Sequence, residues 1–355
     1  METRIARIES ISQFLKLGGF QYRIYDLGRK LTLLPHALFQ KIEDQSLLYP
    51  YPFQQKAWLA LLFWAKGDKA QPTIWFLQFP VDELGYLKQA SRDAFMQELL
   101  IHVGGNLQAQ QSGQQMQDSL KESAFAFKPR QERLAIFHAF ATVELGQQPS
   151  KYYSHTQHYL QGKLGYAQWA FLGLQGIADI IARLHQDDNE HLLSQAVPQL
   201  PITPLISFAE NLEHSAIGDA LSFSLNARLQ QEVRVKKINS PLVAALIRAL
   251  SNSQDISNRQ YIIQQLLVTD VVQDLEVIAA IASRAWQDIT QKDNLPLFMQ
   301  ALAYQPQAAF NAILIDIMGI PNQREPILEA LRDPKRSPLV AKRIGGFFAA
   351  LSSPA

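Results

Sequence analysis

Cysteine is absent from the 355-residue sequence. Disulfide bonds, thiolate zinc sites, iron–sulfur clusters and thiol nucleophiles are therefore excluded. The apolar runs, such as AWLALLFWA at 57–65, are far shorter than the roughly 20 residues that a membrane-spanning helix needs. The N-terminal stretch METRIARIESISQFLKLGGF mixes charged with apolar residues and has no continuous apolar core of the signal-peptide kind. These features predict a soluble cytoplasmic protein with no membrane contact.

A charge excess of one sign is also missing. Lys and Arg number 33 against 32 Asp and Glu, so no global field steers the protein to nucleic acid or to an anionic membrane. The hydrophobic fraction of 47% is ordinary for a globular protein. A chain of this length exceeds what one core comfortably serves, so we expect two domains or one domain with a repetitive extension.

The common catalytic and nucleotide-binding motifs do not occur. GKLG at 162–165 has neither the first glycine nor the Ser or Thr of a P-loop, and no G-x-G-x-x-G or G-x-S-x-G is present. GLQG at 173–176 lies in an apolar helical run, where glycines permit close helix contact. We therefore expect no cofactor and a non-enzymatic role. An enzyme whose site is assembled from distant polar residues stays open as an alternative.

The first third of the chain indicates an α+β domain. Apolar residues at helical spacing predict a helix over 3–16, and QYRIYDLGRKLTLLP at 21–35 predicts strand, turn and strand, with the turn at Gly28. A helix is expected at 36–44. Two further strands are predicted at 56–67 and 72–80, although the first is apolar enough to be a helix instead. The result is a small antiparallel sheet in a domain spanning 1–105.

Two adjacent carboxylates, Asp82 and Glu83, follow the last of these strands. A catalytic pair needs two carboxylates that face one cleft, and neighbours on a turn usually diverge. We interpret them as a turn closed by Gly85, with Leu84 and Leu87 directed to the core. A helix over 91–105 should follow, with Ser91 as its N-cap.

From residue 131 onward strand patterns disappear and helical periodicity dominates. The Gln-rich segment 106–130 is either a linker or a helix. Beyond it, helices are predicted at 131–145, 150–161, 165–185, 189–197, 202–213, 215–231, 241–251, 257–268, 272–288, 293–304, 306–318, 323–332 and 338–351. SPLVAALIRALS, LPLFMQALAYQP and SPLVAKRIGGFFAALS echo one another. The fold class is therefore an α+β N-terminal domain followed by an all-helical region over 131–355, built of stacked hairpins in the manner of HEAT repeats or an α-solenoid.

One loop carries metal-ligand types at close spacing. The stretch HQDDNEH supplies His185, Asp187, Asp188, Glu190 and His191. A zinc or hard-cation site can be built from such residues, but no H-E-x-x-H is present and the spacing fixes no geometry. A solvated helix connection, with Asp188 or Asn189 as the cap of the next helix, is the competing interpretation. We expect no metal here.

Two sets of residues are candidates for binding. The C-terminal cations, which would contact a nucleic-acid backbone, are Arg332, Lys335, Arg336, Lys342 and Arg343. The neutral net charge argues against that use, and no aromatic residues for base stacking lie between them. Aromatic residues are enriched at protein interfaces, which makes Tyr152, Tyr153 and Trp169 candidates for a protein partner.

We expect a protein–protein interaction or scaffold role, through the concave face of the helices or through an exposed sheet edge at Tyr22–Asp26. Nucleic-acid binding is the alternative. The segments FQYRIYDLGRKL, ALFQKIE, YPYPFQQKAWLALLFW and IWFLQFPVDELGYLKQASRDAF resemble the N-terminal part of a bacterial family known only as a domain of unknown function. The resemblance runs over nearly the whole chain. It implies a bacterial protein and offers no activity or catalytic residue to transfer.

Overall fold

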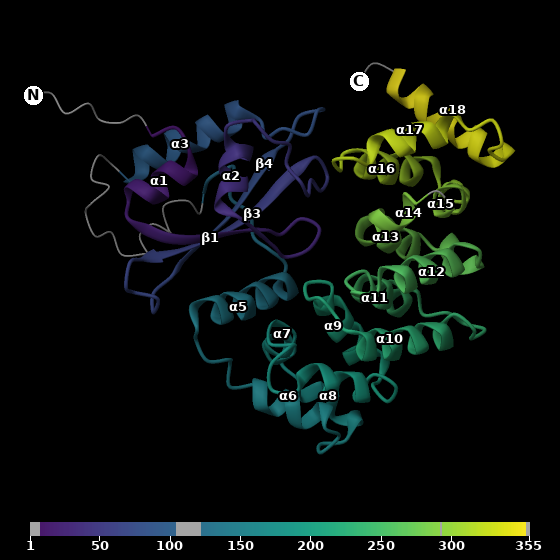
Figure 1. Ribbon diagram of the computed structural model, residues 1–355, viewed down its shortest axis with the longest axis horizontal. Helices are drawn as coiled ribbons and strands as arrows, with labels where there is room; N and C mark the ends of the chain where they lie inside the picture. The colour runs from purple at the N-terminus through teal and green to yellow at the C-terminus, as the bar shows by residue number, and fades with distance from the viewer. Residues whose placement is uncertain (1–7, 104–121, 292, 353–355) are drawn as a thin grey trace, which may run out of the picture. The chain divides into compact units, whose positions relative to one another are not determined.

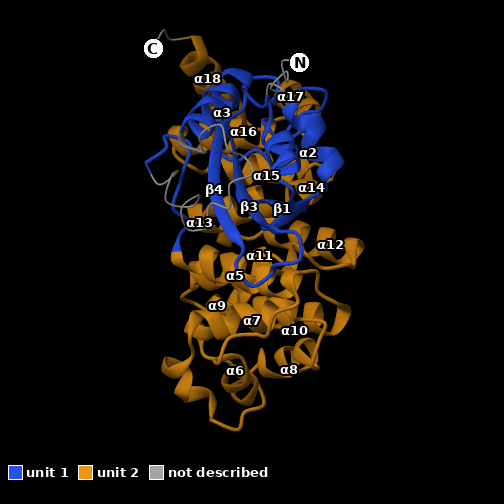
Figure 2. Ribbon diagram, turned by 90° about the vertical axis from the view of Figure 1, so that its left-hand side faces the viewer, with its two compact units in different colours: residues 1–130, 319–321 blue, residues 131–318, 322–355 orange. Residues whose placement is uncertain are grey.

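The computed structural model describes residues 8–103, 122–291 and 293–352 of the chain (Figure 1). Two compact units divide it. The first comprises residues 1–130 with 319–321, and the second comprises residues 131–318 with 322–355 (Figure 2). Each unit has a hydrophobic core of its own.

The first unit contains a four-stranded antiparallel sheet in the order β2-β1-β3-β4. Its strands are β1 (Phe20–Asp26), β2 (Thr32–Leu34), β3 (Lys56–Ala65) and β4 (Thr73–Pro80). The predicted strand–turn–strand and the two later strands are confirmed. β3 is a strand and not the helix that its apolar composition also allowed, because it pairs along its length with β1 on one side and β4 on the other.

The position of β1 corrects the prediction of an open edge at Tyr22–Asp26. β1 lies inside the sheet: the whole strand pairs with β3, and its second half pairs with β2. The Tyr22 carbonyl also accepts a hydrogen bond from His36 Nε2 at 2.9 Å. A partner strand would therefore find most of this stretch already paired.

One face of the sheet packs against helices α1 (Ile11–Leu17), α2 (His36–Glu43) and α3 (Gln89–Val103). β4 shows why, because every second residue from Thr73 to Phe79 is buried and the residues between are half-buried. The ring of Phe14 from α1 stacks on Trp75 with centroids 6.1 Å apart, and Phe95 from α3 meets the same indole edge-on at 6.5 Å. The sheet and these helices therefore enclose one core.

Helix α1 begins at Ile11, later than the predicted start at residue 3; residues 1–7 lie outside the described part. The Ser10 side chain accepts from Gln13 N–H at 3.1 Å. The buried Glu43 carboxylate accepts from the backbone N–H groups of Ile11 at 2.7 Å and Ser12 at 3.1 Å. These bonds satisfy the first free amides of the helix and set its start. Burial raises the pKa of Glu43 above its usual value, although the bonds from Ser12 and Ile11 act against this.

The Asp82 and Glu83 stretch is a turn, as predicted. The Asp82 carboxylate accepts from the N–H groups of Leu84 at 3.0 Å and Tyr86 at 2.8 Å, and Gly85 takes a left-handed φ of 97°. The prediction that Leu84 faces the core is wrong, because its side chain is 69% exposed while Leu87 is buried.

Helix α3 begins at Gln89 and not at the predicted cap Ser91. It ends at Val103, and residues 104–121, which include most of the Gln-rich segment, lie outside the described part of the chain.

The second unit consists of helices throughout its described residues, with one isolated bridge between Ile217 and Ser253 in place of any strand. Its α-helices are α5 (Gln131–Leu145), α6 (Tyr153–Leu160), α7 (Leu174–Ala182), α8 (Asn189–Ala196), α9 (Ile202–Leu212), α10 (Asp219–Glu232), α11 (Ser240–Leu250), α12 (Ile256–Leu267), α13 (Leu275–Arg284), α14 (Trp286–Ile289), α15 (Asn294–Ala303), α16 (Gln307–Met318), α17 (Arg324–Arg332) and α18 (Pro338–Ser352); η1 (Tyr166–Phe171) and η2 (Asp270–Gln273) are 3₁₀-helices. The predicted helices are confirmed with small shifts of their ends, apart from two.

Both exceptions are single predicted helices that the structure breaks. The region 165–185 divides into η1 and α7, because Gly173 is extended at φ −82° and ψ 140°. The region 272–288 divides into the end of η2, then α13 and α14, with Asp274 extended between the first two.

Alternate helices of the second unit pack in two rows. Along one row α5, α7, α9, α11 and α13 each contact the next, and along the other α6, α8 and α10 do so. Figure 1 shows the helices following one another in chain order. α11 lies at the centre of this core: its Asn239 cap accepts from Leu242 N–H at 3.0 Å, and nearly every following side chain is buried. No helix in the described residues combines the length and apolarity required to cross a bilayer.

Candidate functional site

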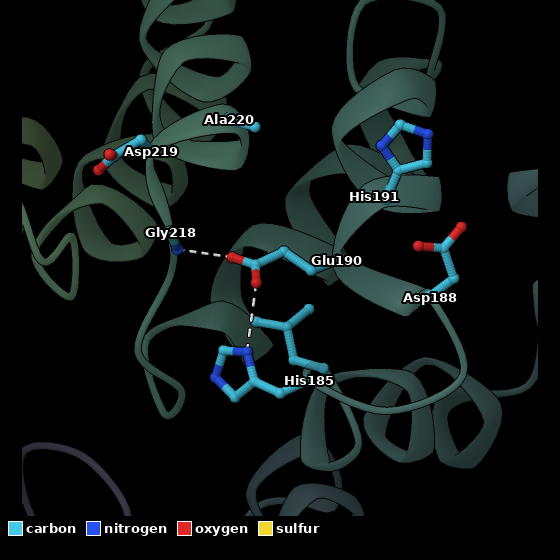
Figure 3. Close-up of a pocket in the computed structure, with 8 residues that line it drawn as sticks. His185, Asp188, Glu190, His191, Gly218, Asp219 and Ala220 are labelled. Atoms are coloured by element: carbon cyan, nitrogen blue, oxygen red, sulfur yellow. Dashed lines mark hydrogen bonds and ion pairs between the residues drawn. The ribbon is translucent and has the colours of Figure 1, made fainter.

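A pocket of about 520 Å³ lies where the α7–α8 connection meets the start of α10. It is lined by Leu184, His185, Asp188, Glu190, His191, Gly218, Asp219 and Ala220 (Figure 3). Four of the five residues predicted as weak metal candidates thus reach one pocket. The fifth, Asp187, does not line it, because its carboxylate accepts a hydrogen bond from the Tyr153 hydroxyl at 2.8 Å.

The connection that carries these residues is held in a constrained conformation. Asp187 and Asp188 are consecutive non-glycine residues in the left-handed region, at φ 49° and φ 60°. Aspartate tolerates this region better than most residues. Buried Asn189 fixes the loop, because its amide donates to the Tyr153 hydroxyl at 2.7 Å and to the Arg183 carbonyl at 2.8 Å. Asn189 is the first residue of α8, which confirms a helix connection at HQDDNEH.

Glu190 is the central side chain of the pocket. Its carboxylate accepts from the backbone N–H of Gly218 at 2.5 Å and lies 3.2 Å from His185 Nδ1. Gly218 is the N-cap of α10, so Glu190 places a negative charge at the positive end of that helix. A Cβ on residue 218 would lie 3.2 Å from Glu190 Oε1, which explains why a glycine stands there. This carboxylate therefore ties α8 to α10.

The remaining polar groups of the pocket diverge. His191 Nε2 is paired with Gln195 Nε2 at 2.8 Å, one turn along α8. Figure 3 shows Asp219 on one side of Glu190, and Asp188 and His191 on the other. Among the described residues no group of three or more His, Asp or Glu is arranged to hold a metal ion. Proton transfer between two groups at a reacting atom needs convergence that this arrangement does not provide.

The predicted aromatic residues lie around the connection between α6 and α7. Tyr152 is 43% exposed and Trp169 is 37% exposed, whereas Tyr153 is buried. Burial raises the pKa of Tyr153 to about 12, with its bond to Asp187 in the same direction. Tyr153 is thus a support of the α7–α8 connection and offers little surface. Phe171, which the sequence analysis missed, is 70% exposed.

Tyr152 approaches the end of η1 from the other side of this connection. A Cβ on Gly173, two residues after Phe171, would lie 3.5 Å from Tyr152 Cγ. A Cβ on Gly176 would lie 2.9 Å from the Tyr152 carbonyl oxygen. Of the two glycines predicted to permit close helix contact, Gly176 does so, against Thr156 and Tyr152, whereas the contact at Gly173 is an ordinary van der Waals distance. We call Tyr152, Trp169 and Phe171 the aromatic surface.

The C-terminal cations are divided by their contacts. Arg332, Lys335 and Lys342 are exposed. Arg343 is half-buried and its guanidinium donates to the Ala303 carbonyl at 2.9 Å, which joins α18 to the end of α15. Arg336 donates to the Asp333 carbonyl at 2.7 Å. Arg336 is exposed as well, so four of the five predicted cations face solvent and Arg343 is half-buried.

Periodicity did not reveal a buried ion cluster at the end of α9. The Glu213 carboxylate takes two bonds from Arg284, at 2.7 and 3.2 Å, and lies 3.1 Å from Arg133 and 3.5 Å from His214. Burial by itself would raise the pKa of Glu213, but the charges of Arg284, His214 and Arg133 outweigh it and lower the pKa to about 2. Arg284 stands 71 residues after Glu213 and Arg133 stands 80 residues before it, so no local motif could have signalled this cluster.

The family model described as "Protein of unknown function (DUF3549)" matches residues 6–348. No curated protein and no solved structure matches the chain.

Proposed function

Because the chain belongs to the family described as a protein of unknown function (DUF3549), which brings no activity with it, we propose a function from the residues themselves. The second unit is a scaffold that binds another protein and performs no catalysis of its own. The arrangement of its helices, its exposed apolar side chains and the contacts inside its pocket support this proposal.

The helical arrangement provides a broad solvent-exposed surface for a partner. Helices that alternate between two rows bury a continuous core and leave the outer side of each row to solvent, as in HEAT-type hairpins. The core runs from α5 to α18 without interruption. Such an array presents a broad, ordered face on which a partner can rest.

The observation that carries the proposal is the number of large apolar side chains that ordered segments of this unit expose. A single exposed leucine or phenylalanine is ordinary, but clusters of them on a monomer mark interaction surfaces. In the second unit these side chains are Tyr152, Trp169, Phe171, Ile202, Phe223, Val235, Ile256, Tyr261, Val268, Leu275, Tyr304, Phe348 and Leu351. Exposure of such side chains costs solubility, which favours a use in binding.

The pocket supports a structural use of its ionisable groups. The Glu190 carboxylate, which lies 3.2 Å from His185 Nδ1, already accepts a hydrogen bond from the N–H of Gly218, the N-cap of α10. A general acid or base must reach a substrate proton with its own lone pair or proton. The groups around Glu190 are better explained by the joining of two hairpins.

Affinity isolation tests the proposal. The full-length chain, tagged and expressed at its native level, should retain one protein through washing at about 0.5 M salt, where surface charge contacts are strongly screened. The identified protein should then bind the purified chain in calorimetry with a defined stoichiometry. Failure of every captured protein to bind the purified chain would refute the scaffold role. A salt-sensitive gel shift with mixed RNA and DNA would instead support the nucleic-acid alternative.

A further inference from the structure

The connection between α6 and α7 exposes aromatic side chains from a fixed backbone. None of the residues of η1 is buried, and Phe171 and Trp169 are 70% and 37% exposed. If the loop were flexible, binding would have to order these residues, at a cost in conformational entropy. An anchored loop presents them already in place, which lowers that cost.

A tyrosine pair anchors the loop to α6. The hydroxyl of Tyr159 donates to the Tyr166 carbonyl at 2.9 Å, and the hydroxyl of Tyr166 donates to the Leu160 carbonyl at 3.1 Å. Their rings meet at right angles with centroids 5.5 Å apart. Between these two tyrosines, Gly162 and Gly165 take left-handed φ values of 73° and 76°, which allow the chain to reverse. Trp169 and Phe171 are therefore held outward by their own neighbours.

The chain segment that carries the aromatic surface has charges of one sign only. Residues 145–178 contain no Asp or Glu, although the whole chain is nearly neutral. Lys151, Lys163, His155 and His158 are all exposed there. Lys151 Nζ lies 5.3 Å from the ring centroid of Tyr152, in a cation–π arrangement.

Two carboxylates that contact this segment from outside it are already engaged. Asp179 accepts from Ser150 N–H at 2.9 Å and lies 3.3 Å from Arg183. Asp187 accepts from the Tyr153 hydroxyl at 2.8 Å. Neither supplies a counter-charge to the exposed lysines, so the segment is complementary to negative charge brought by another molecule.

We propose that the aromatic surface is the docking site for an acidic segment of a partner protein, in which aromatic or aliphatic side chains stand between Asp or Glu residues. The apolar side chains of the partner would cover Trp169 and Phe171, and its carboxylates would meet Lys151 and Lys163. This rests on the proposed scaffold function and names its partner class. Removal of an aromatic anchor typically costs an interface tenfold or more in affinity.

Two other occupants fit less well. A nucleic acid carries a charge on every phosphate, and two lysines with two histidines neutralise few of them. In a symmetric dimer through this surface, each copy would place its cations opposite those of the other, because a two-fold interface joins the same patch to itself. An acidic peptide needs only a few cations beside its apolar contacts.

A peptide selection on the full-length protein tests the proposal. Random 12-residue peptides displayed on phage are selected on the wild type and counter-selected on the Trp169→Ala/Phe171→Ala variant. A matched control, Leu84→Ala/Ile101→Ala, removes two exposed apolar side chains from the first unit, where they are 69% and 79% exposed. The melting curve of the control should match the wild type, and that of the aromatic variant, in which Trp169 is 37% exposed, should stay within about 5 °C of it.

The expected result is a set of enriched peptides with net negative charge and one or more large apolar residues. Their Kd should rise about tenfold or more on the aromatic variant and severalfold with Lys163→Glu, and stay within about twofold on the control. No enrichment, or enriched peptides that are neutral or basic, would overturn the proposal. Binding of a 12-nucleotide RNA that is lost in the aromatic variant would also overturn the proposal. So would a dimer, detected by light scattering, that is lost in the same variant.

The two proposals fail in different ways. If the partner isolated by affinity binds the aromatic variant with unchanged Kd, the docking site is wrong and the scaffold function stands. If that partner is lost with the aromatic variant but its bound segment contains no acidic residues, the site stands and the charge argument is wrong, which overturns the proposed partner class. If no partner exists, the scaffold function itself fails.

Discussion

Replacement of Glu213 by glutamine should destabilise the helical unit strongly at neutral pH. The carboxylate is 5% exposed and gathers Arg284, Arg133 and His214 around it. Glutamine keeps the shape and removes the charge, which leaves the buried Arg284 guanidinium without its counter-ion. Removal of one partner from a buried ion pair typically costs about 3–5 kcal/mol.

The pKa gives an independent magnitude. A fall from the ordinary 4.5 to about 2 corresponds to about 3 kcal/mol of stabilisation by the ionised form. A depressed carboxyl pKa contributes stability that is complete above 4.5 and is lost as the pH falls through 2. Urea unfolding followed by circular dichroism should therefore show about 3 kcal/mol between wild type and variant at pH 7, and a smaller gap at each step from pH 4.5 toward pH 2.

Glu210, three residues earlier on α9, provides the control. Burial raises the pKa of Glu210, and Arg248 at 3.6 Å only partly offsets this. Its side chain is 43% exposed, so Glu210→Gln should change the stability by less than about 0.5 kcal/mol. A loss below about 1 kcal/mol for Glu213→Gln at pH 7, or a gap that stays constant on acidification, would refute the assigned role of the cluster.

Three further substitutions test other contacts by urea unfolding. Gly176→Ala should cost about 1–3 kcal/mol, because the new methyl group would collide with Thr156 on α6; an unchanged midpoint would contradict the close packing. Tyr49→Phe removes the 2.5 Å hydrogen bond to buried Asp26 and should cost about 1–3 kcal/mol at pH 7. Burial raises the pKa of Tyr49 well above 10, so ionisation favours the unfolded wild type as the pH rises above 10, and the gap to the Phe variant should narrow there. Glu190→Ala leaves the N–H of Gly218, the N-cap of α10, without its acceptor and should cost about 1 kcal/mol, while a gain in stability would show that the acidic loop repels itself.

The sequence predicts most elements of the fold because their patterns are local. Alternation marks β4, and apolar stripes between Pro, Gly, Asn and Asp mark the helices from 131 onward. The failures are also local in cause. η1 and α7 lie in one stretch with helical apolar spacing. Periodicity does not show that Gly173 adopts an extended backbone there. Leu84 is a leucine on a turn, and hydrophobicity alone does not report that such a residue faces solvent.

The sites were less predictable because they depend on pairs distant in the chain. The stretch HQDDNEH is recognisable as a group of metal-ligating residue types. Gly218, whose N–H donates a hydrogen bond to Glu190, is 28 residues away. Tyr152 and Trp169 were found as aromatic residues, whereas Phe171 was not. Its signal was present in the run YAQWAF after two glycines, but a period of 3.6 assigns those residues to a buried helix. Only three-dimensional contacts separate an aromatic anchor from a core residue.

The Glu213 cluster also bears on how the helical unit comes apart. In an array where each hairpin touches only its neighbours, members can fray singly from either end. Arg133 belongs to α5 and Arg284 to α13, and a single carboxylate between them spans five successive members of one row. Unfolding of α5 would leave a buried charge with fewer partners as far away as α13. Amides from 131 to 284 should therefore exchange with deuterium as one cooperative block, while α16 to α18 open earlier and independently.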